Sequence, residues 1–125
     1  MAIIVYAESQ NGEFKKNAFE AISYGKSVAQ ETNKNLVAIC INAKEPKILG
    51  NYGVEKIISV NDSSLNEFTA QNYANVISEY SKNEKVSILV MSSSADSKYI
   101  APLIAVQLDA GLASNVVSKP LSFKP

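Results

Sequence analysis

Residues 90–115 read VMSSSADSKYIAPLIAVQLDAGLASN. This stretch combines the end of a strand, a polar loop, a helix and a glycine at the end of the helix. The apolar, β-rich run Val86–Met91 leads into this stretch, and the serines and Asp96 then offer side-chain oxygens to the start of a helix. Pro102 is expected near that start, because proline lacks the amide hydrogen that a helix interior uses. Gly111 is typical of a helix end. The stretch therefore predicts one strand–loop–helix unit of an α/β fold.

The same alternation of apolar runs and amphipathic segments continues through the rest of the chain. Further strands are expected at 2–7, 36–41 and 54–60, with a short last strand around 114–118. Helices are expected at 13–32 and 44–49 and after the loop 61–64. Strands that are apolar on both faces are typical of parallel sheets covered by helices on both sides. The sequence predicts one domain over residues 1–125, an α/β fold of three layers that is doubly wound around a mainly parallel sheet.

The composition limits the chemistry that the chain can carry out. All 12 basic residues are lysines, they balance 12 acidic residues, and there is neither arginine nor histidine. Neutral charge and the missing guanidinium fork argue against a nucleic-acid partner. Without histidine and with the single cysteine Cys40, a His-based triad, a Cys–His pair and nearly every zinc site are excluded. No catalytic residue and no metal site is predicted.

Cys40 lies in the apolar run 36–41, where we expect a buried, inert thiol. A lone cysteine forms no internal disulfide, which fits a reducing compartment. Met1 leads almost directly into the first strand, and the sequence shows no targeting or transmembrane segment. We therefore expect a cytoplasmic, bacterial protein that does not insert into a membrane.

In a doubly wound sheet, ligands meet the carboxyl ends of the strands, which here are followed by the loops 8–12, 42–44, 61–64 and 92–97. In the last of these loops, Ser94, Ser97 and Lys98 are candidates for an anion site at the start of a helix. Plain helix capping is the favoured alternative, because the loop lacks the glycines of nucleotide-binding loops. Glu8 follows the first strand, and we expect it to be exposed to solvent rather than to hold a ligand.

Four tyrosines combine a large apolar ring with a polar tip that suits a recognition surface. Core packing is nevertheless the expectation for each of them singly. These residues are Tyr52, Tyr73, Tyr80 and Tyr99.

Several fragments, in the right order along the chain, resemble one known family. They are Val5–Glu8, Gly12–Lys16, Tyr52–Ile57, Tyr73–Ala74 and Ile100–Ser114. Together they look like the amino-terminal domain of an electron transfer flavoprotein alpha subunit. The chain departs from the family where Ser97–Tyr99 replaces a common Gly-Arg-Asp, and where Leu103 and Asn115 replace charged residues.

The resemblance implies a Rossmann-like, adenine nucleotide alpha hydrolase-like fold and a heterodimer with the electron transfer flavoprotein beta subunit. Such a protein takes electrons from primary dehydrogenases of the acyl-CoA dehydrogenase type, as in fatty acid beta-oxidation, holds them on FAD and passes them to a quinone reductase. In the family the FAD motifs lie in the carboxyl-terminal half, and this sequence stops at residues 122–125, before they would begin. We therefore expect a scaffold and beta-subunit-contacting domain, not an enzyme, with no FAD bound to this chain.

Two other classes of function remain open. The alternation of strands and helices and the serine loop at 92–97 also resemble a small adenine-nucleotide-binding module of the universal stress protein type. Such a module would bind ATP or AMP. A third interpretation is a structural domain whose surface simply docks onto a partner.

Overall fold

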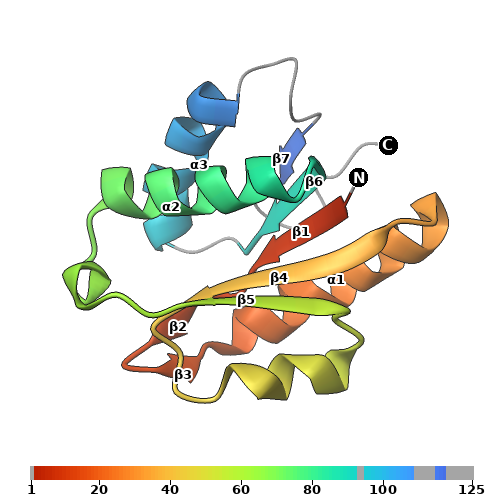
Figure 1. Cartoon of the computed structure of the whole chain (residues 1–125), viewed down its shortest axis with the longest axis horizontal. Helices are drawn as coiled ribbons and strands as arrows, with labels where there is room; N and C mark the ends of the chain where they lie inside the picture. Colours follow the sequence, from red (N-terminus) through yellow and green to blue (C-terminus); the bar gives the residue numbers. More distant parts are fainter. Residues whose placement is uncertain (1, 93–94, 109–114, 118–125) are drawn as a thin grey trace.

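Residues 2–92, 95–108 and 115–117 are described by the computed structural model, which forms one α/β unit (Figure 1). Its sheet is built from β1 (Ala2–Tyr6), β4 (Asn35–Ile41), β5 (Lys56–Val60), β6 (Val86–Met91) and β7 (Asn115–Val117). These five strands lie in the order β5-β4-β1-β6-β7, and every neighbouring pair is parallel. The chain thus adds strands on one side of β1 and then crosses to the other side, which confirms the doubly wound fold.

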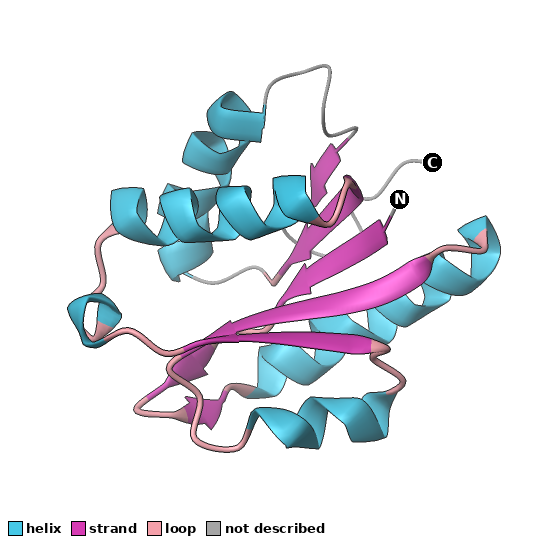
Figure 2. Cartoon of the chain, in the orientation of Figure 1, coloured by secondary structure: helices cyan, strands magenta, loops and turns pink. Residues whose placement is uncertain are grey.

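Helices cover both faces of this sheet (Figure 2). Helix α1 (Lys16–Thr32) covers one face, and α2 (Ala70–Asn83) and α3 (Ala95–Leu108) cover the other. Side chains of β1 alternate between these layers: Ile3 and Val5 pack in the core cluster with α1, whereas Ile4 packs in the cluster with α2 and α3. Two separate apolar cores therefore sandwich the sheet, as expected for parallel strands that are apolar on both faces.

The first helix begins later than the sequence predicts. A helix was expected from about Glu13, but β2 (Ser9–Gln10) pairs with β3 (Glu13–Phe14) in a short antiparallel hairpin, and α1 begins at Lys16. The turn consists of Asn11 and Gly12, both with positive φ, at 54° and 84°. This dipeptide is a strong hairpin signal, since both central positions of the favoured turn require a left-handed backbone.

Two further elements differ in detail from the expectation. Pro102 lies well inside α3 rather than near its start, because the helix already begins at Ala95. Its ring is exposed, so it does not disturb the core side of the helix. The expected short helix at 44–49 is a 3-10 helix, η1 (Pro46–Tyr52), with the proline at its first position.

The remaining elements match closely. A second 3-10 turn, η2 (Ser63–Leu65), precedes α2, and β6 has the predicted bounds. The short last strand is present as β7, whereas the predicted stop at Gly111 lies outside the described residues.

Close packing between α1 and β1 leads to a first prediction, at Gly25. A Cβ atom at this position would lie 2.5 Å from Cγ2 of Val5 and 3.2 Å from Cδ1 of Leu36. Gly25→Ala should therefore lower the free energy of unfolding by about 1–3 kcal/mol, the usual cost of overpacking a core. Urea unfolding monitored by circular dichroism measures the change.

Gly50 provides the matched control, because nothing lies within 4 Å of a Cβ built there. Gly50→Ala should change the free energy of unfolding by no more than about 0.5 kcal/mol. Equal effects of the two substitutions would contradict the packing of α1 on β1.

Candidate functional site

The loops that follow β1, β4, β5 and β6 lie together at the carboxyl-terminal end of the parallel sheet. Glu8 follows β1, Asn42 follows β4, and Ser92 follows β6. The strand order reverses between β1 and β6, whose residues Tyr6 and Met91 are partners in the ladder. In doubly wound sheets this point of reversal is the usual ligand crevice, and we call the space beyond β1 and β6 the switch-point crevice.

Glu8 is buried rather than solvated, so the expectation of an exposed carboxylate is wrong. Only 2% of the residue is exposed. Lys15 Nζ lies 2.6 Å from Glu8 Oε2, and Ser92 Oγ lies 3.5 Å from Glu8 Oε1. A carboxylate is buried at tolerable cost only when it is paired and hydrogen-bonded in this way. The pair also closes the base of the β2–β3 hairpin, where the Lys15 amide donates to the Glu8 carbonyl at 3.1 Å.

Tyr6, at the end of β1, lies in the same polar environment. Burial raises the pKa of its phenol well above the ordinary value, and the negative charge of Glu8 acts in the same direction. The pKa of Tyr73 is also raised, first by burial and then by Asp96 and Glu8. Both phenols are therefore neutral at physiological pH and can take part only in hydrogen bonding and packing.

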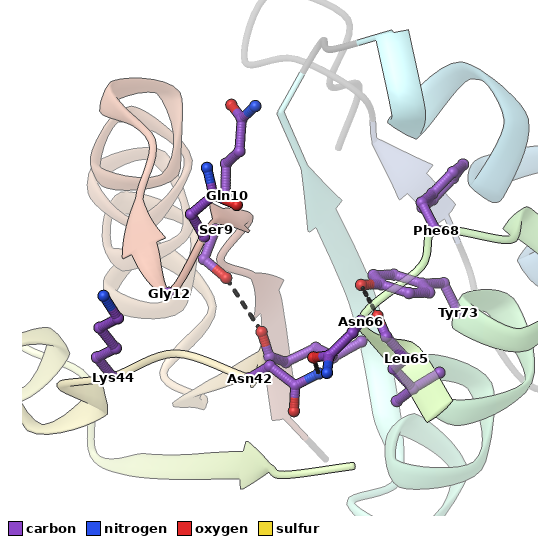
Figure 3. A pocket seen from close by; sticks show the side chains of 11 residues that line it. Ser9, Gln10, Gly12, Asn42, Lys44, Leu65, Asn66, Phe68 and Tyr73 are labelled. Atoms are coloured by element: carbon purple, nitrogen blue, oxygen red, sulfur yellow. Dashed lines mark hydrogen bonds between the residues drawn. The ribbon is translucent and has the colours of Figure 1, made fainter. Parts of the chain in front are cut away.

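Beside the crevice lies a pocket of about 390 Å³ between the β2–β3 hairpin and the segment that leads from η2 into α2 (Figure 3). Its wall is held by internal hydrogen bonds: Ser9 Oγ donates to the Ile41 carbonyl at 3.0 Å, and Tyr73 OH donates to the Leu65 carbonyl at 2.7 Å. The lining residues are Ser9, Gln10, Asn11, Gly12, Ile41, Asn42, Lys44, Leu65, Asn66, Phe68 and Tyr73.

Asn42 ties the end of β4 to the residues around η2. Its Nδ2 donates to the Asp62 carbonyl at 2.9 Å and to Asn66 Oδ1 at 3.0 Å, while its Oδ1 accepts from the Asp62 amide at 2.8 Å. The Asn42 backbone is left-handed, with φ at 53°, a conformation that asparagine tolerates better than most residues. The side-chain amide of Asn42 is therefore engaged in hydrogen bonds within the chain. Lys44 is the one charged residue among the lining residues of the pocket.

The candidate anion residues lie in different environments. Ser97 is buried within α3, whereas Lys98 next to it is exposed. Ser94 lies outside the described residues. The anion site at this loop stays a prediction. Cys40 is fully buried, which confirms that part of the expectation, and burial raises the pKa of its thiol.

The surface of α3 carries an apolar stripe that sequence reasoning did not locate. Ile100, Ile104 and Leu108 face the core, each fully buried. On the outer side Tyr99 is 67% exposed and Val106 80% exposed. We call Tyr99, Pro102 and Val106 the outer α3 face, since their spacing of three and four residues places them on one side of the helix. Core packing of Tyr52, Tyr80 and Tyr99 was the wrong expectation, because all three are exposed.

The described residues contain neither a candidate metal cluster nor a candidate membrane-spanning helix. No three of their histidine, cysteine, aspartate and glutamate side chains come together as a possible metal site. None of their helices is both long enough and apolar enough to cross a membrane.

The parallel sheet, its strand order and the polar loops at the carboxyl-terminal ends of its strands define a Rossmann-like α/β domain. The family model of the electron transfer flavoprotein domain matches residues 3–123, and the chain belongs to this family. The resemblance to an electron transfer flavoprotein alpha subunit is thereby confirmed.

Known relatives agree with the family match. The electron transfer flavoprotein subunit alpha of Clostridium acetobutylicum is 28% identical over 117 residues, covering 91% of this chain and 35% of the relative. That of Bacillus subtilis is 28% identical over 116 residues, covering 92% and 36%. The acryloyl-CoA reductase electron transfer subunit beta of Anaerotignum propionicum is 28% identical over 116 residues, covering 90% and 32%. The chain thus spans about a third of the length of these curated relatives.

The raised pKa of Tyr6 leads to a prediction about alkaline pH. A raised pKa in the folded state means that the stabilising contribution is complete below the unfolded pKa of about 10 and is lost as pH rises towards the folded value. The free energy of unfolding should fall above about pH 10, by at most about 1.4 kcal/mol per pH unit for this one group. Tyr6→Phe should flatten that part of the curve, as measured by urea unfolding at a series of pH values.

Tyr99→Phe is the matched control, because it removes the same hydroxyl group from an exposed side chain. It should leave the wild-type pH dependence unchanged. If Tyr6→Phe and wild type lose stability in parallel above pH 10, the burial of a neutral phenol at the end of β1 is refuted.

Proposed function

We propose that this chain is the scaffold and beta-subunit-contacting domain of an electron transfer flavoprotein alpha subunit. The observation that carries the proposal is the family match over residues 3–123 together with the alpha-subunit relatives. In the whole protein, FAD would take electrons from primary dehydrogenases of the acyl-CoA dehydrogenase type and pass them to a quinone reductase. The domain itself would contribute no catalytic residue to this electron transfer.

The described residues do not fit FAD. In doubly wound folds the pyrophosphate of a dinucleotide lies at the switch point, where amide groups and the positive end of a helix stabilise its charge. Here the buried carboxylate of Glu8 lies at that position. A second negative group beside it would be repelled. We therefore propose that the flavin binds outside this chain.

The outer α3 face supports a role in contact with a partner subunit. Large apolar side chains that remain exposed along one helix side are a common feature of protein–protein interfaces. Tyr99 is of the type that often carries much of the binding energy at an interface, since its ring buries a large area at little entropic cost. We assign this face to the beta subunit.

Ligand titration separates this proposal from the adenine-nucleotide-binding module. The midpoint of thermal unfolding is measured for the 125-residue chain with FAD, AMP and ATP in turn. A scaffold domain should show no shift with any of them, whereas a ligand at a hundredfold excess over its dissociation constant would stabilise the folded chain by about 2.7 kcal/mol. A shift with FAD overturns the placement of the flavin, and a shift with AMP or ATP alone supports the nucleotide-binding module.

Val106→Glu tests the assignment of the outer α3 face. A carboxylate buried in an apolar interface is costly, so affinity for the beta subunit from the same organism should fall at least about tenfold. Titration calorimetry with the purified beta subunit measures the change. The stability of the chain itself should be unaffected, because Val106 is 80% exposed.

Ser27→Glu is the matched control for this substitution. Ser27 is exposed on α1, which covers the opposite face of the sheet, and the substitution adds the same charge. It should leave the affinity unchanged. Equal affinities for Val106→Glu and wild type would move the contact away from α3.

A further inference from the structure

The switch-point crevice contains the donors that an anionic ligand would need. Lys15 contributes an ammonium group at the entrance to α1, and Ser92 contributes a hydroxyl directly after β6. An ammonium and a hydroxyl that converge on one point are a common arrangement for holding a carboxylate or a phosphate. Both groups converge here on a single carboxylate of the chain itself.

That carboxylate belongs to Glu8, and each of its oxygens has a partner within the chain. Its two oxygens have different partners, Oε2 with Lys15 at 2.6 Å and Oε1 with Ser92 at 3.5 Å. The Glu8 side chain is only 3% exposed, whereas that of Lys15 is 31% exposed. The lysine is therefore the more exposed partner of the ion pair, and the carboxylate is the buried one.

We propose that Glu8 is a built-in occupant of the switch-point crevice, taking the place that a phosphate or carboxylate group of a ligand would take. The wild-type crevice then excludes small oxyanions, because the cationic donor is neutralised, the hydroxyl is already engaged and a negative charge is present. Removal of this one side chain unmasks a site for a free oxyanion held by Lys15 and Ser92.

Two carboxylates of the chain act on the phenols beside the crevice. The carboxylate contributes to the raised pKa of both Tyr6 and Tyr73, although burial is the larger cause in each. Asp96 also acts on both phenols, so a second negative charge lies on the α3 side. An incoming anion would meet two carboxylates and one ammonium, and the loss of Glu8 removes the net negative charge.

The test is chemical rescue of Glu8→Ala by small oxyanions. Thermal unfolding is followed in sodium phosphate, sodium formate and sodium chloride at matched ionic strength. Glu8→Ala should be less stable than wild type in chloride. Phosphate or formate at tenfold excess over its dissociation constant should then raise its midpoint by about 5 °C, with saturation, relative to chloride.

Three variants make the result specific to the crevice. Glu13→Ala removes an exposed carboxylate from the adjacent strand β3, and should respond to phosphate and formate no more than wild type does. Glu8→Gln keeps the side-chain volume, so the crevice stays filled and should also show no rescue. Adding Lys15→Gln to Glu8→Ala should abolish the rescue, because the cationic donor is lost.

The outcome decides the proposal even when Glu8→Ala is unfolded in chloride. In that case recovery of its circular dichroism spectrum in formate or phosphate, and not in chloride, supports an oxyanion position in the crevice. A chain that stays unfolded in all three salts overturns it. A folded Glu8→Ala that responds to oxyanions no more than Glu13→Ala also overturns it, and leaves Glu8–Lys15 as an ordinary structural ion pair.

Discussion

Burial of β1 on both faces is the constraint on which the rest of this domain depends. The five residues of the strand are each 5% exposed or less, so neither face can be left to solvent. Hydrogen bonds to β4 on one side and β6 on the other satisfy its backbone, and helices must then cover both faces. The close approach of α1 through Gly25 and the packing of Ile100 and Ile104 from α3 both follow from this requirement.

The same constraint shapes the carboxyl-terminal end of the sheet. Because β1 is central, the residues that follow it emerge between the ends of β4 and β6 and remain buried. Glu8 is the first charged residue after the strand, and it is stabilised there by Lys15 and Ser92. A crevice that in many doubly wound proteins receives a ligand is thus filled by the chain's own carboxylate.

The sequence was sufficient to predict the fold but not the arrangement of the site. Strand β6 has the predicted bounds because its mainly apolar run is flanked by polar residues at both ends. The dipeptide Asn11-Gly12 signals the β2–β3 hairpin. The hairpin was missed because the helical periodicity of the following residues was taken to begin at Glu13, which lies in β3. The burial of Glu8 depends on Ser92, which is 84 residues away in the sequence. The outer α3 face was not predicted either, because α3 has few polar residues and periodicity alone does not show which side is covered.

The most direct test of this account is amide chemical-shift mapping of the 125-residue chain by NMR as purified electron transfer flavoprotein beta subunit is added. We predict that the largest changes fall on α3 around Tyr99 and Val106, while α1 and the surroundings of Glu8 remain unchanged. Changes centred on Glu8 and Ser92 would show that the crevice is itself a binding site, and would contradict the account. Absence of any change at saturating beta subunit would contradict the subunit-contact role altogether.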